Sequence, residues 1–495
     1  MILSIFLPVL AGVLLLISSA AGKWKNAGEP SAQELKKLHL FSLIFLSVSA
    51  LMAVIAAWTS DAEIVLFNLM DNIPIAFAID DVGRIFVTLI SVIWVTTMIY
   101  SFVYMKHEGE EKRFFGFYII VYGVLAALCF AKNLVTLYLF YEIMTLTSMP
   151  MVLHSGSRES IMAALKYLFY SMCGAYCGLF GIFFLNKYCD TLTFTAGGTL
   201  NPELAAAHQG ILLIAVMVMI LGFGVKAGML PMHAWLPTAH PVAPSPASAV
   251  LSGIIVKCGI LAIIRVVFFV VGPDFIRGTW VQTTWMVLAL MTVFMGSMLA
   301  FREKVFKKRL AYSTVSQASY IMFGLSALNE TAFTGAMLHV VFHAFIKCTL
   351  FLTAGIFIFQ CHKTRVEELR GIGKQMPGTV WCYTFASLAL IGIPPTSGFI
   401  SKWYLAQGAL TADIGVFSYV GPAVLLVSAL LTAGYLLPIT INGFFPGEGF
   451  AVPQKQEAPD GMLLPLVFLA AMTVLFGIFP NPLINFLSQI ASTIM

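Results

Sequence analysis

Three ionisable side chains recur at helical spacing within the apolar segment TAFTGAMLHVVFHAFIKCTLFL. His339, His343 and Lys347 lie four residues apart, so in a helix they share one face and span about 12 Å. An imidazole titrates near neutral pH and can donate and accept a hydrogen bond at once, which suits proton transfer between amines. A metal site is the weaker interpretation, because no third ligand stands nearby. For His339 alone, a buried ring satisfied by a carbonyl remains an alternative.

Other charged side chains stand inside long apolar runs, where each costs roughly 2.5–3.5 kcal/mol at the centre of a membrane helix. Such residues are functional candidates by default. Lys166 and Arg265 lie about two helical turns from a segment end or from another lysine, so snorkelling to the membrane surface is an equal alternative for them. Together with the stripe of His339, His343 and Lys347 on one helix face, the candidate functional residues are Glu142, Lys226, Lys257, His339, His343, Lys347 and Lys402.

Two of these lysines lie beside helix-breaking residues. Lys226 occurs in LGFGVKAGMLPMHAWLP, and Lys402 follows the Pro-Pro of LIGIPPTSGFISKWYL. Membrane helices are broken only where protein or a water-filled cavity satisfies the freed backbone groups. A pair of broken helices in the two halves of a chain indicates inverted repeats with an ion site between them.

The composition defines the class of protein that holds these residues. Of the 495 residues, 59% are hydrophobic and only 10% are charged, whereas a soluble domain carries about 25% charge. This excludes a soluble enzyme, a disordered chain and a nucleic-acid binder. The eight cysteines form no CxxC pair, and no phosphate loop or nucleophile–base motif is present, so we expect no metal, no cofactor and no redox centre in this chain.

Apolar runs separated by Gly, Pro and charge clusters predict an all-α, multi-pass membrane protein of about fourteen helices. The expected spans are 1–22, 39–60, 82–105, 114–131, 133–153, 160–186, 209–230, 242–271, 282–301, 309–328, 332–361, 377–411, 418–443 and 461–491.

The basic residues predict the orientation of these spans. Most of the 28 Lys and Arg fall in loops that follow odd-numbered spans, and the first such loop holds Lys23, Lys25, Lys36 and Lys37. Because basic loops stay in the cytoplasm, we expect both termini on the outer, periplasmic face of a cell inner or plasma membrane.

The broken spans are the seventh and the twelfth, and an offset of five helices inverts the topology. We therefore predict two inverted five-helix repeats, 106–271 and 272–443. Three helices, 1–105, would precede them, and one, 444–495, would follow.

Four segments resemble the antiporter-like subunits of respiratory complex I, of the Mrp cation/proton antiporters and of the energy-converting membrane-bound hydrogenases. They are residues 222–266, 307–324, 338–355 and 392–405. Within the first, AHPVAPSPASA (239–249) is more similar to the hydrogenase and formate-hydrogenlyase branch. The family fold has fourteen helices with two inverted five-helix repeats.

The resemblance also implies roles. Glu142 matches the glutamate that pairs with the lysine of the broken seventh helix, here Lys226, and Lys257 matches the connecting lysine of the eighth. His339, His343 and Lys347 match the central polar axis. Lys402 matches the terminal ionisable residue of the twelfth helix.

These roles lead to a hypothesis of stepwise proton translocation coupled to a neighbouring subunit, because this chain has no driving reaction of its own. The expected partners are other integral membrane subunits of a complex I-like, hydrogenase or Mrp-type assembly, including further antiporter-like subunits. The transported ion is the proton, with Na⁺ as the alternative in a Na⁺/H⁺ antiporter. A purely structural anchor is a third alternative, and the cost of burying the lysines argues against it.

Overall fold

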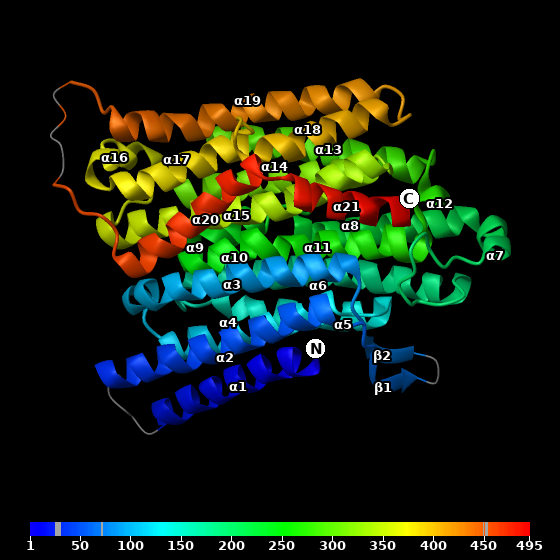
Figure 1. The fold of residues 1–495 in the computed structure, drawn as a ribbon, viewed down its shortest axis with the longest axis horizontal. Helices are drawn as coiled ribbons and strands as arrows, with labels where there is room; N and C mark the ends of the chain where they lie inside the picture. The colour runs from blue at the N-terminus through cyan, green and yellow to red at the C-terminus, as the bar shows by residue number, and fades with distance from the viewer. Residues whose placement is uncertain (25–30, 71–72, 449, 451–453) are drawn as a thin grey trace.

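The structure, a computed structural model, describes residues 1–24, 31–70, 73–448, 450 and 454–495, and Lys25 lies outside them. The described chain is a bundle of nearly parallel helices with one small hairpin at its edge (Figure 1). The first helices are α1 (Ile2–Trp24), α2 (Ala32–Thr59), α3 (Asp81–Glu108), α4 (Glu111–Cys129), α5 (Leu134–Val152) and α6 (Arg158–Tyr188).

The middle of the chain is more interrupted. Its elements are α7 (Pro202–Ala207), α8 (Gln209–Ala227), α9 (Leu236–Val242), α10 (Ser245–Val250), the π-helix η1 (Leu251–Ile255), α11 (Val256–Ile264), the π-helix η2 (Arg265–Val271) and α12 (Pro273–Ile276).

The last third consists of long helices and two short ones. They are α13 (Trp280–Arg302), α14 (Phe306–Ser326), α15 (Glu330–Cys361), the 3-10 helix η3 (Val366–Leu369), α16 (Ile372–Gln375), α17 (Pro377–Ile391), α18 (Ser397–Thr411), α19 (Phe417–Phe444), α20 (Asp460–Ile478) and α21 (Asn481–Ile494).

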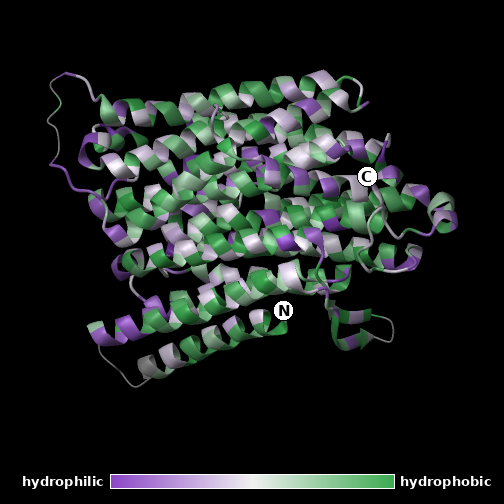
Figure 2. Ribbon diagram, viewed as in Figure 1, coloured by the Kyte–Doolittle hydropathy of each residue, from purple (hydrophilic) through white to green (hydrophobic). Residues whose placement is uncertain are grey.

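Twelve helices of the described chain are long and apolar enough to cross a membrane, which confirms a helical, multi-pass membrane protein. Figure 2 shows hydrophobic residues along most of their length. Two expected spans are not among the twelve: 309–328 corresponds to α14, and 377–411 is divided into α17 and α18, of 15 residues each. The number of crossings and the two repeats therefore stay predictions.

Both expected breaks are present, and the protein satisfies the backbone at each. α8 ends at Gly228, whose φ of 77° requires the left-handed region, and the Trp235 indole donates to the Val225 carbonyl at 2.8 Å. α17 ends before Gly392, and the Lys402 ammonium donates to the carbonyls of the last two residues of α17.

Three sequence-based assignments need correction. The expected last span, 461–491, consists of two helices, because Phe479 and Pro480 separate α20 from α21. α2 begins at Ala32 rather than 39, since Ser31 and Glu34 form a capping box, so Lys36 and Lys37 belong to the helix. The loop near residue 70 contains an antiparallel pair, β1 (Ile64–Met70) and β2 (Ile73–Phe77), in which Ile64 lies opposite Phe77.

The centre of the bundle is formed by α15 and by the continuous stretch from α10 to η2. Other helices enclose the stretch from α10 to η2 completely and α15 almost completely. α1 to α6 lie on one side of this centre, and α13, α14 and α17 to α19 lie on the other (Figure 1). The ionisable residues of α11 and α15 are therefore far from lipid.

Basic loops gather at one end of the bundle, which we call the basic face: residues 106–113, 303–305 and 362–376. Contacts join these loops to their neighbours. The Lys304 ammonium lies 3.1 Å from a Glu367 carboxylate oxygen, and the Arg113 guanidinium donates to the His154 carbonyl.

Candidate functional site

The centre of the bundle brings a lysine and a histidine into direct contact. Lys257 on α11 and His343 on α15 are fully buried, and Nζ lies 2.6 Å from Nδ1. Lys257 also donates to the Ser252 carbonyl at 2.6 Å, inside the π-helical turn η1. Because one partner of this contact must accept, the pair holds at most one proton between the two nitrogens.

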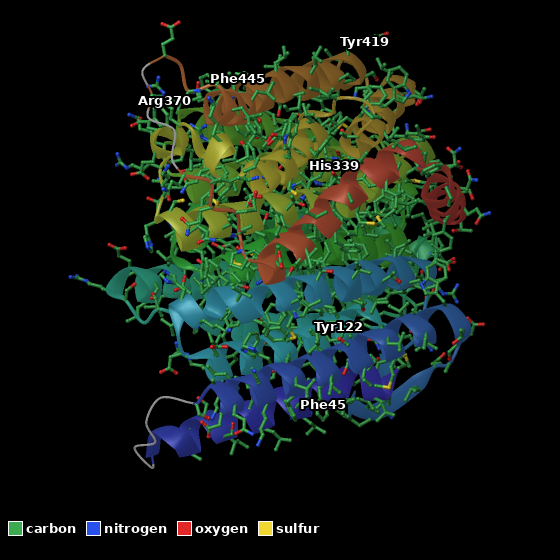
Figure 3. The ribbon with its side chains drawn as sticks, turned by 60° about the vertical axis from the view of Figure 1, so that its left-hand side comes forward. Phe45, Tyr122, His339, Arg370, Tyr419 and Phe445 are labelled. Atoms are coloured by element: carbon green, nitrogen blue, oxygen red, sulfur yellow. The ribbon has the colours of Figure 1, made fainter. Side chains whose placement is uncertain are left out.

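The same face of α15 continues to either side of His343. Lys347 donates to the Ser313 hydroxyl and to the Leu310 carbonyl, both on α14. His339 lies between the Ser401 hydroxyl on α18, at 2.9 Å, and the side-chain oxygen of Gln317 on α14, at 3.1 Å. Figure 3 labels His339 in the interior of the bundle.

Lys226, at the end of α8, has a separate environment of hydroxyl groups. Its ammonium donates to Thr145 Oγ1 at 2.8 Å, to the Tyr167 hydroxyl at 3.0 Å and to Ser171 Oγ at 3.1 Å. It also lies 4.6 Å from the centre of the Tyr167 ring, within cation–π range. Residues of α5 and α6 thus hold the lysine where α8 breaks.

Glu142 is half-buried and lies outside the hydrogen bonds of this hydroxyl cluster. It accepts from the Tyr138 hydroxyl at 3.2 Å, and the flanking Leu139 and Leu146 are exposed on the same helix. The direct pair with Lys226 that the resemblance implies is not among the ion pairs of the described residues, since Lys226 binds hydroxyls instead. Thr145, one turn along α5 from Glu142, accepts one of these hydrogen bonds from Lys226.

Lys402 lies at the far end of the polar series, on α18. Its ammonium donates to the carbonyls of Leu390 and Ile391 at 2.6 and 2.9 Å and lies 5.1 Å from the Tyr320 ring centre. Tyr320 in turn stacks on His339, with ring centres 5.7 Å apart. Lys402 therefore both closes the broken helix and borders the central axis.

Lys166 and Arg265, the two ambiguous residues, have different environments. Lys166 is half-buried and donates to Thr238 Oγ1 at 3.0 Å. Arg265 is 1% exposed and makes a two-pronged ion pair with Asp80, the residue that caps α3. A pair of this kind holds two elements together, so Arg265 does not snorkel.

The structure also buries polar residues that the sequence analysis placed in loops or did not single out. Lys307 and Arg309 lie in the first turn of α14, where both are buried and donate to backbone carbonyls. His240, in α9, is fully buried. The run KKR at 307–309 has the pattern of a solvated loop, so only the tertiary structure shows that Lys307 and Arg309 are buried.

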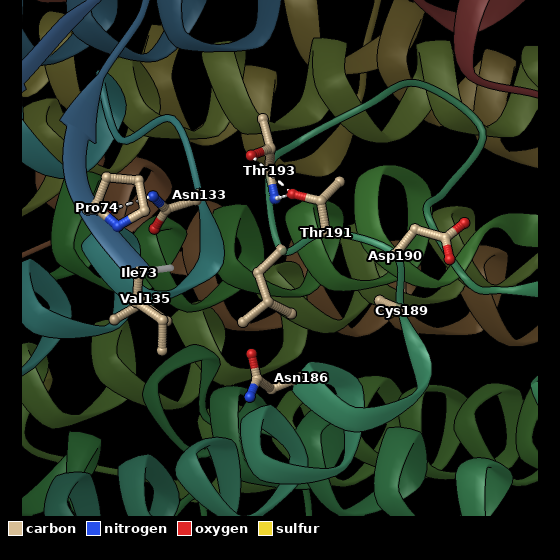
Figure 4. A pocket seen from close by; sticks show the side chains of 10 residues that line it. Ile73, Pro74, Asn133, Val135, Asn186, Cys189, Asp190, Thr191 and Thr193 are labelled. Carbon is tan, nitrogen blue, oxygen red and sulfur yellow. Dashed lines mark hydrogen bonds between the residues drawn. The ribbon is translucent and has the colours of Figure 1, made fainter. Parts of the chain in front are cut away.

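A pocket of about 470 Å³ lies away from these residues, between β2, the start of α5 and the end of α6 (Figure 4). Its polar lining includes Asn133, Asn186, Asp190, Thr191 and Thr193. The Asn133 amide donates to the Pro74 carbonyl at 2.7 Å. None of the seven predicted residues lines it.

Comparison with known proteins defines the family. Residues 131–441 match the family described as "NADH:quinone oxidoreductase/Mrp antiporter, TM", and residues 67–115 match "NADH-Ubiquinone oxidoreductase (complex I), chain 5 N-terminus". The chain belongs to this family. It is 32% identical over 434 residues to NADH-quinone oxidoreductase subunit N of Desulforudis audaxviator, which covers 84% of each chain.

Other members of the family support the same assignment. Hydrogenase-4 component B of Escherichia coli is 31% identical over 426 residues, which is 81% of this chain and 62% of that protein. The fold matches a subunit in the structure of an Mrp complex from Dietzia sp., with a TM-score of 0.83 and 21% identity over 99% of this chain and 96% of that one.

Within this family fold, the seven predicted residues fall into three groups by their contacts. Lys226 lies among hydroxyls with Glu142 outside them. Lys257, His343 and Lys347 lie at the centre, and His339 and Lys402 lie toward α18.

Proposed function

We propose that this antiporter-like subunit translocates protons within a redox-driven membrane complex related to complex I, of the kind that includes energy-converting hydrogenases. The chain's membership of the NADH:quinone oxidoreductase/Mrp antiporter family supports ion translocation. The chemistry of the buried residues supports the proton as the ion. They are amines, imidazoles and hydroxyls, which exchange protons and, except for Glu142, carry no negative charge to hold a metal cation.

The Lys257–His343 contact is the observation that carries this proposal. A cation buried without a carboxylate partner is costly, and two basic nitrogens 2.6 Å apart cannot both be cationic without strong repulsion. The arrangement therefore favours a single proton that moves between the two residues. A structural anchor has no need of such a pair.

The proposed route follows the three groups in order. A proton released by Lys226 passes to Lys257 and then to His343. Lys347, on one side of His343 along α15, exchanges protons with this pair, and from His343 the proton moves through His339, on the other side, toward Lys402. Each transfer leaves one group neutral and its neighbour charged, so the total charge in the membrane changes only when a proton is taken up or released at a face.

Coupling to the rest of the complex would act on Glu142. This carboxylate lies at the outer surface of α5, half-buried between exposed apolar residues, where a neighbouring membrane subunit would contact it. A change of charge beside Glu142 alters the field at Lys226 and hence its tendency to release a proton.

We also propose that the basic face is cytoplasmic, following the positive-inside rule, with both termini on the outer face of a cell inner or plasma membrane. Cysteine labelling from each side of oriented vesicles, at residues introduced near positions 304 and 495, tests this orientation. Labelling of position 304 from the outside would contradict it.

The test of proton translocation is Lys257→Met in the assembled complex. Methionine keeps the length and apolar stem of lysine but cannot hold a proton. We expect the variant to assemble and to keep electron transfer in detergent, while proton uptake by inside-out membrane vesicles falls by at least about 100-fold.

The matched control is Lys304→Met, because Lys304 is an exposed lysine of the basic face. It should leave proton uptake at the wild-type level. Full proton translocation by the Lys257→Met complex would overturn the proposal.

A Na⁺/H⁺ antiporter subunit of an Mrp-type assembly is the second candidate. The hydroxyl cluster favours it, because Thr145, Ser148, Tyr167 and Ser171 offer several oxygens around Lys226, and a hard cation needs several oxygen ligands. Proteoliposomes that hold the complex distinguish the two. Proton movement that depends on Na⁺, without an electron donor, would select the antiporter.

A further inference from the structure

The junction between α9 and α10, residues 240–245, gathers buried polar groups that the proposed route does not use. His240 lies in the last turn of α9, the Ala243 carbonyl accepts from the Lys307 ammonium, and Ser245 begins α10. His240 and Ser245 are fully buried. The junction lies within AHPVAPSPASA, the segment that the sequence analysis singled out for its branch resemblance.

A continuous hydrogen-bonded chain leads from this junction to the basic face. The Ser245 hydroxyl donates to the Tyr104 hydroxyl at 3.3 Å, and the Tyr104 hydroxyl donates to the Glu108 carboxylate at 3.0 Å. Tyr104 is 1% exposed, whereas Glu108, the last residue of α3, is partly exposed. The chain therefore runs from the protein surface into the core.

The same junction holds a histidine without hydrogen-bond partners. Neither ring nitrogen of His240 has a partner among the described residues, although the ring is fully buried and stacks on Phe351 at 4.7 Å. Buried ring nitrogens without a partner are unfavourable unless water binds there. Lys257, Lys307 and Lys347 are all close enough to act electrostatically on this ring.

We propose that Glu108, Tyr104 and Ser245 form a proton-uptake branch that loads His240 from the basic face and supplies the central cluster of Lys257, His343 and Lys347. The branch rests on the proposed function, because it takes protons only if the central cluster transports them. It extends that function to four residues outside the seven predicted ones.

The proton balance of the branch is simple. Glu108 takes a proton from water and passes it to the Tyr104 oxygen, Tyr104 passes its own hydroxyl proton to Ser245, and Ser245 passes its own inward. A bridging water completes the step to a ring nitrogen of His240. The Tyr104 and Ser245 hydroxyls must rotate inward before this transfer, and the transfer itself leaves their protons in the observed orientation, with Glu108 ionised and ready for the next proton.

Electrostatics give the branch a direction. Glu108 lies close enough to the Lys307 ammonium to act on its charge, so the carboxylate attracts protons to the mouth of the branch. The positive charges around His240 repel a proton that rests there, which moves it on toward whichever central group is neutral.

Tyr104→Phe and Tyr100→Phe provide a matched test. Both tyrosines are buried on α3 one turn apart, and their rings stack at 5.9 Å, but the Tyr100 hydroxyl donates only to the Leu352 carbonyl. Each variant loses one hydroxyl and keeps its ring. In inside-out vesicles that hold the assembled complex, we expect Tyr104→Phe to slow proton uptake about tenfold and Tyr100→Phe to leave it unchanged.

Substitutions at Glu108 separate proton transfer from a structural role, because the side chain is partly exposed. Glu108→Gln should slow uptake as Tyr104→Phe does, and Glu108→Asp, which keeps the carboxylate, should restore most of the rate. The amount of subunit in the membrane and its thermal unfolding in detergent should match wild type in all four variants.

The outcomes distinguish this inference from the proposed function. Wild-type uptake in Tyr104→Phe together with lost uptake in Lys257→Met would overturn the branch and leave the function standing. Equal losses in the Tyr104 and Tyr100 variants would also overturn the branch, since packing alone would then explain them. Wild-type uptake in Lys257→Met would overturn both.

Discussion

The buried lysines of this protein are satisfied by neutral groups rather than by carboxylates. Lys226 donates to three hydroxyls, Lys402 to two carbonyls and Lys257 to a carbonyl and an imidazole. A buried ion pair fixes both charges, because removal of one leaves the other unpaired. A hydroxyl can donate or accept, so it remains a partner whether the amine is charged or neutral. This environment suits groups that gain and lose protons during turnover.

The hydroxyl environment of Lys226 leads to a prediction at the residue scale. Thr145→Val removes one acceptor from the Lys226 ammonium and preserves the shape of the side chain. A hydrogen bond to a charged group contributes about 1.5–3 kcal/mol, so we expect proton uptake to change by about tenfold or more. Uptake by inside-out vesicles that hold the complex measures this.

Thr147→Val is the control for that substitution. Thr147 lies on the same helix, and its hydroxyl donates to the Ile143 carbonyl at 2.8 Å rather than binding the lysine. It should retain wild-type uptake, and an equal loss in both variants would show that the effect comes from α5 rather than from Lys226.

At the scale of elements, the break between α17 and α18 is held from outside by α20. A side chain at Gly477 of α20 would collide with the backbone of Pro395, Thr396 and Ser397, the residues of the break. Close contact between α20 and this segment is possible only because residue 477 has no Cβ. α20 thus positions Lys402 indirectly, through the break that this lysine closes.

We therefore expect Gly477→Ala to destabilise the protein by about 1–3 kcal/mol, because the break must shift to admit a methyl group. Thermal unfolding of the purified protein in detergent measures the change. Gly210→Ala on α8 is the control, since a Cβ there meets no atom within 4 Å, and it should be neutral or slightly stabilising. Equal stability of the two variants would contradict the packing argument.

At the scale of the whole molecule, one ion pair joins the N-terminal helices to the central stretch. Asp80 and Arg265 are 185 residues apart in sequence, and the pair ties the start of α3 to η2. The Arg265 guanidinium also lies 4.8 Å from the ring centres of Phe194 and Phe269. This end of the bundle, opposite the basic face, is closed by that contact.

The pair makes stability depend on pH in a defined direction. Burial raises the pKa of Asp80, but the Arg265 guanidinium and the Gly83 backbone N–H outweigh burial and hold the pKa below its usual value. Because the folded state binds this proton less readily than the unfolded state, the stabilisation is complete above pH about 4 and is lost as the pH falls below it.

Asp80→Asn tests this relation, since asparagine caps a helix as well as aspartate does and removes only the charge. We expect the variant to be less stable by about 2 kcal/mol at pH 7, with a difference that narrows below pH about 4. Thermal unfolding in detergent across this range measures it. A difference that is independent of pH would show that the charge of Asp80 does not matter.

The sequence by itself determined the class of the protein, the two breaks and the stripe on α15. Apolar runs of membrane length indicate spans, clusters of Gly and Pro favour helix breaks, and side chains four residues apart share a helix face. These are local properties, so they can be read without knowledge of the fold.

Only the tertiary structure decided which groups each charge contacts. His343 and Lys257 are 86 residues apart, and nothing in either segment indicates that one binds the other. Lys307 has the sequence of a loop residue and the burial of a core residue. Contacts between distant segments depend on how helices pack against each other, and that packing turns seven scattered ionisable residues into three groups with defined partners.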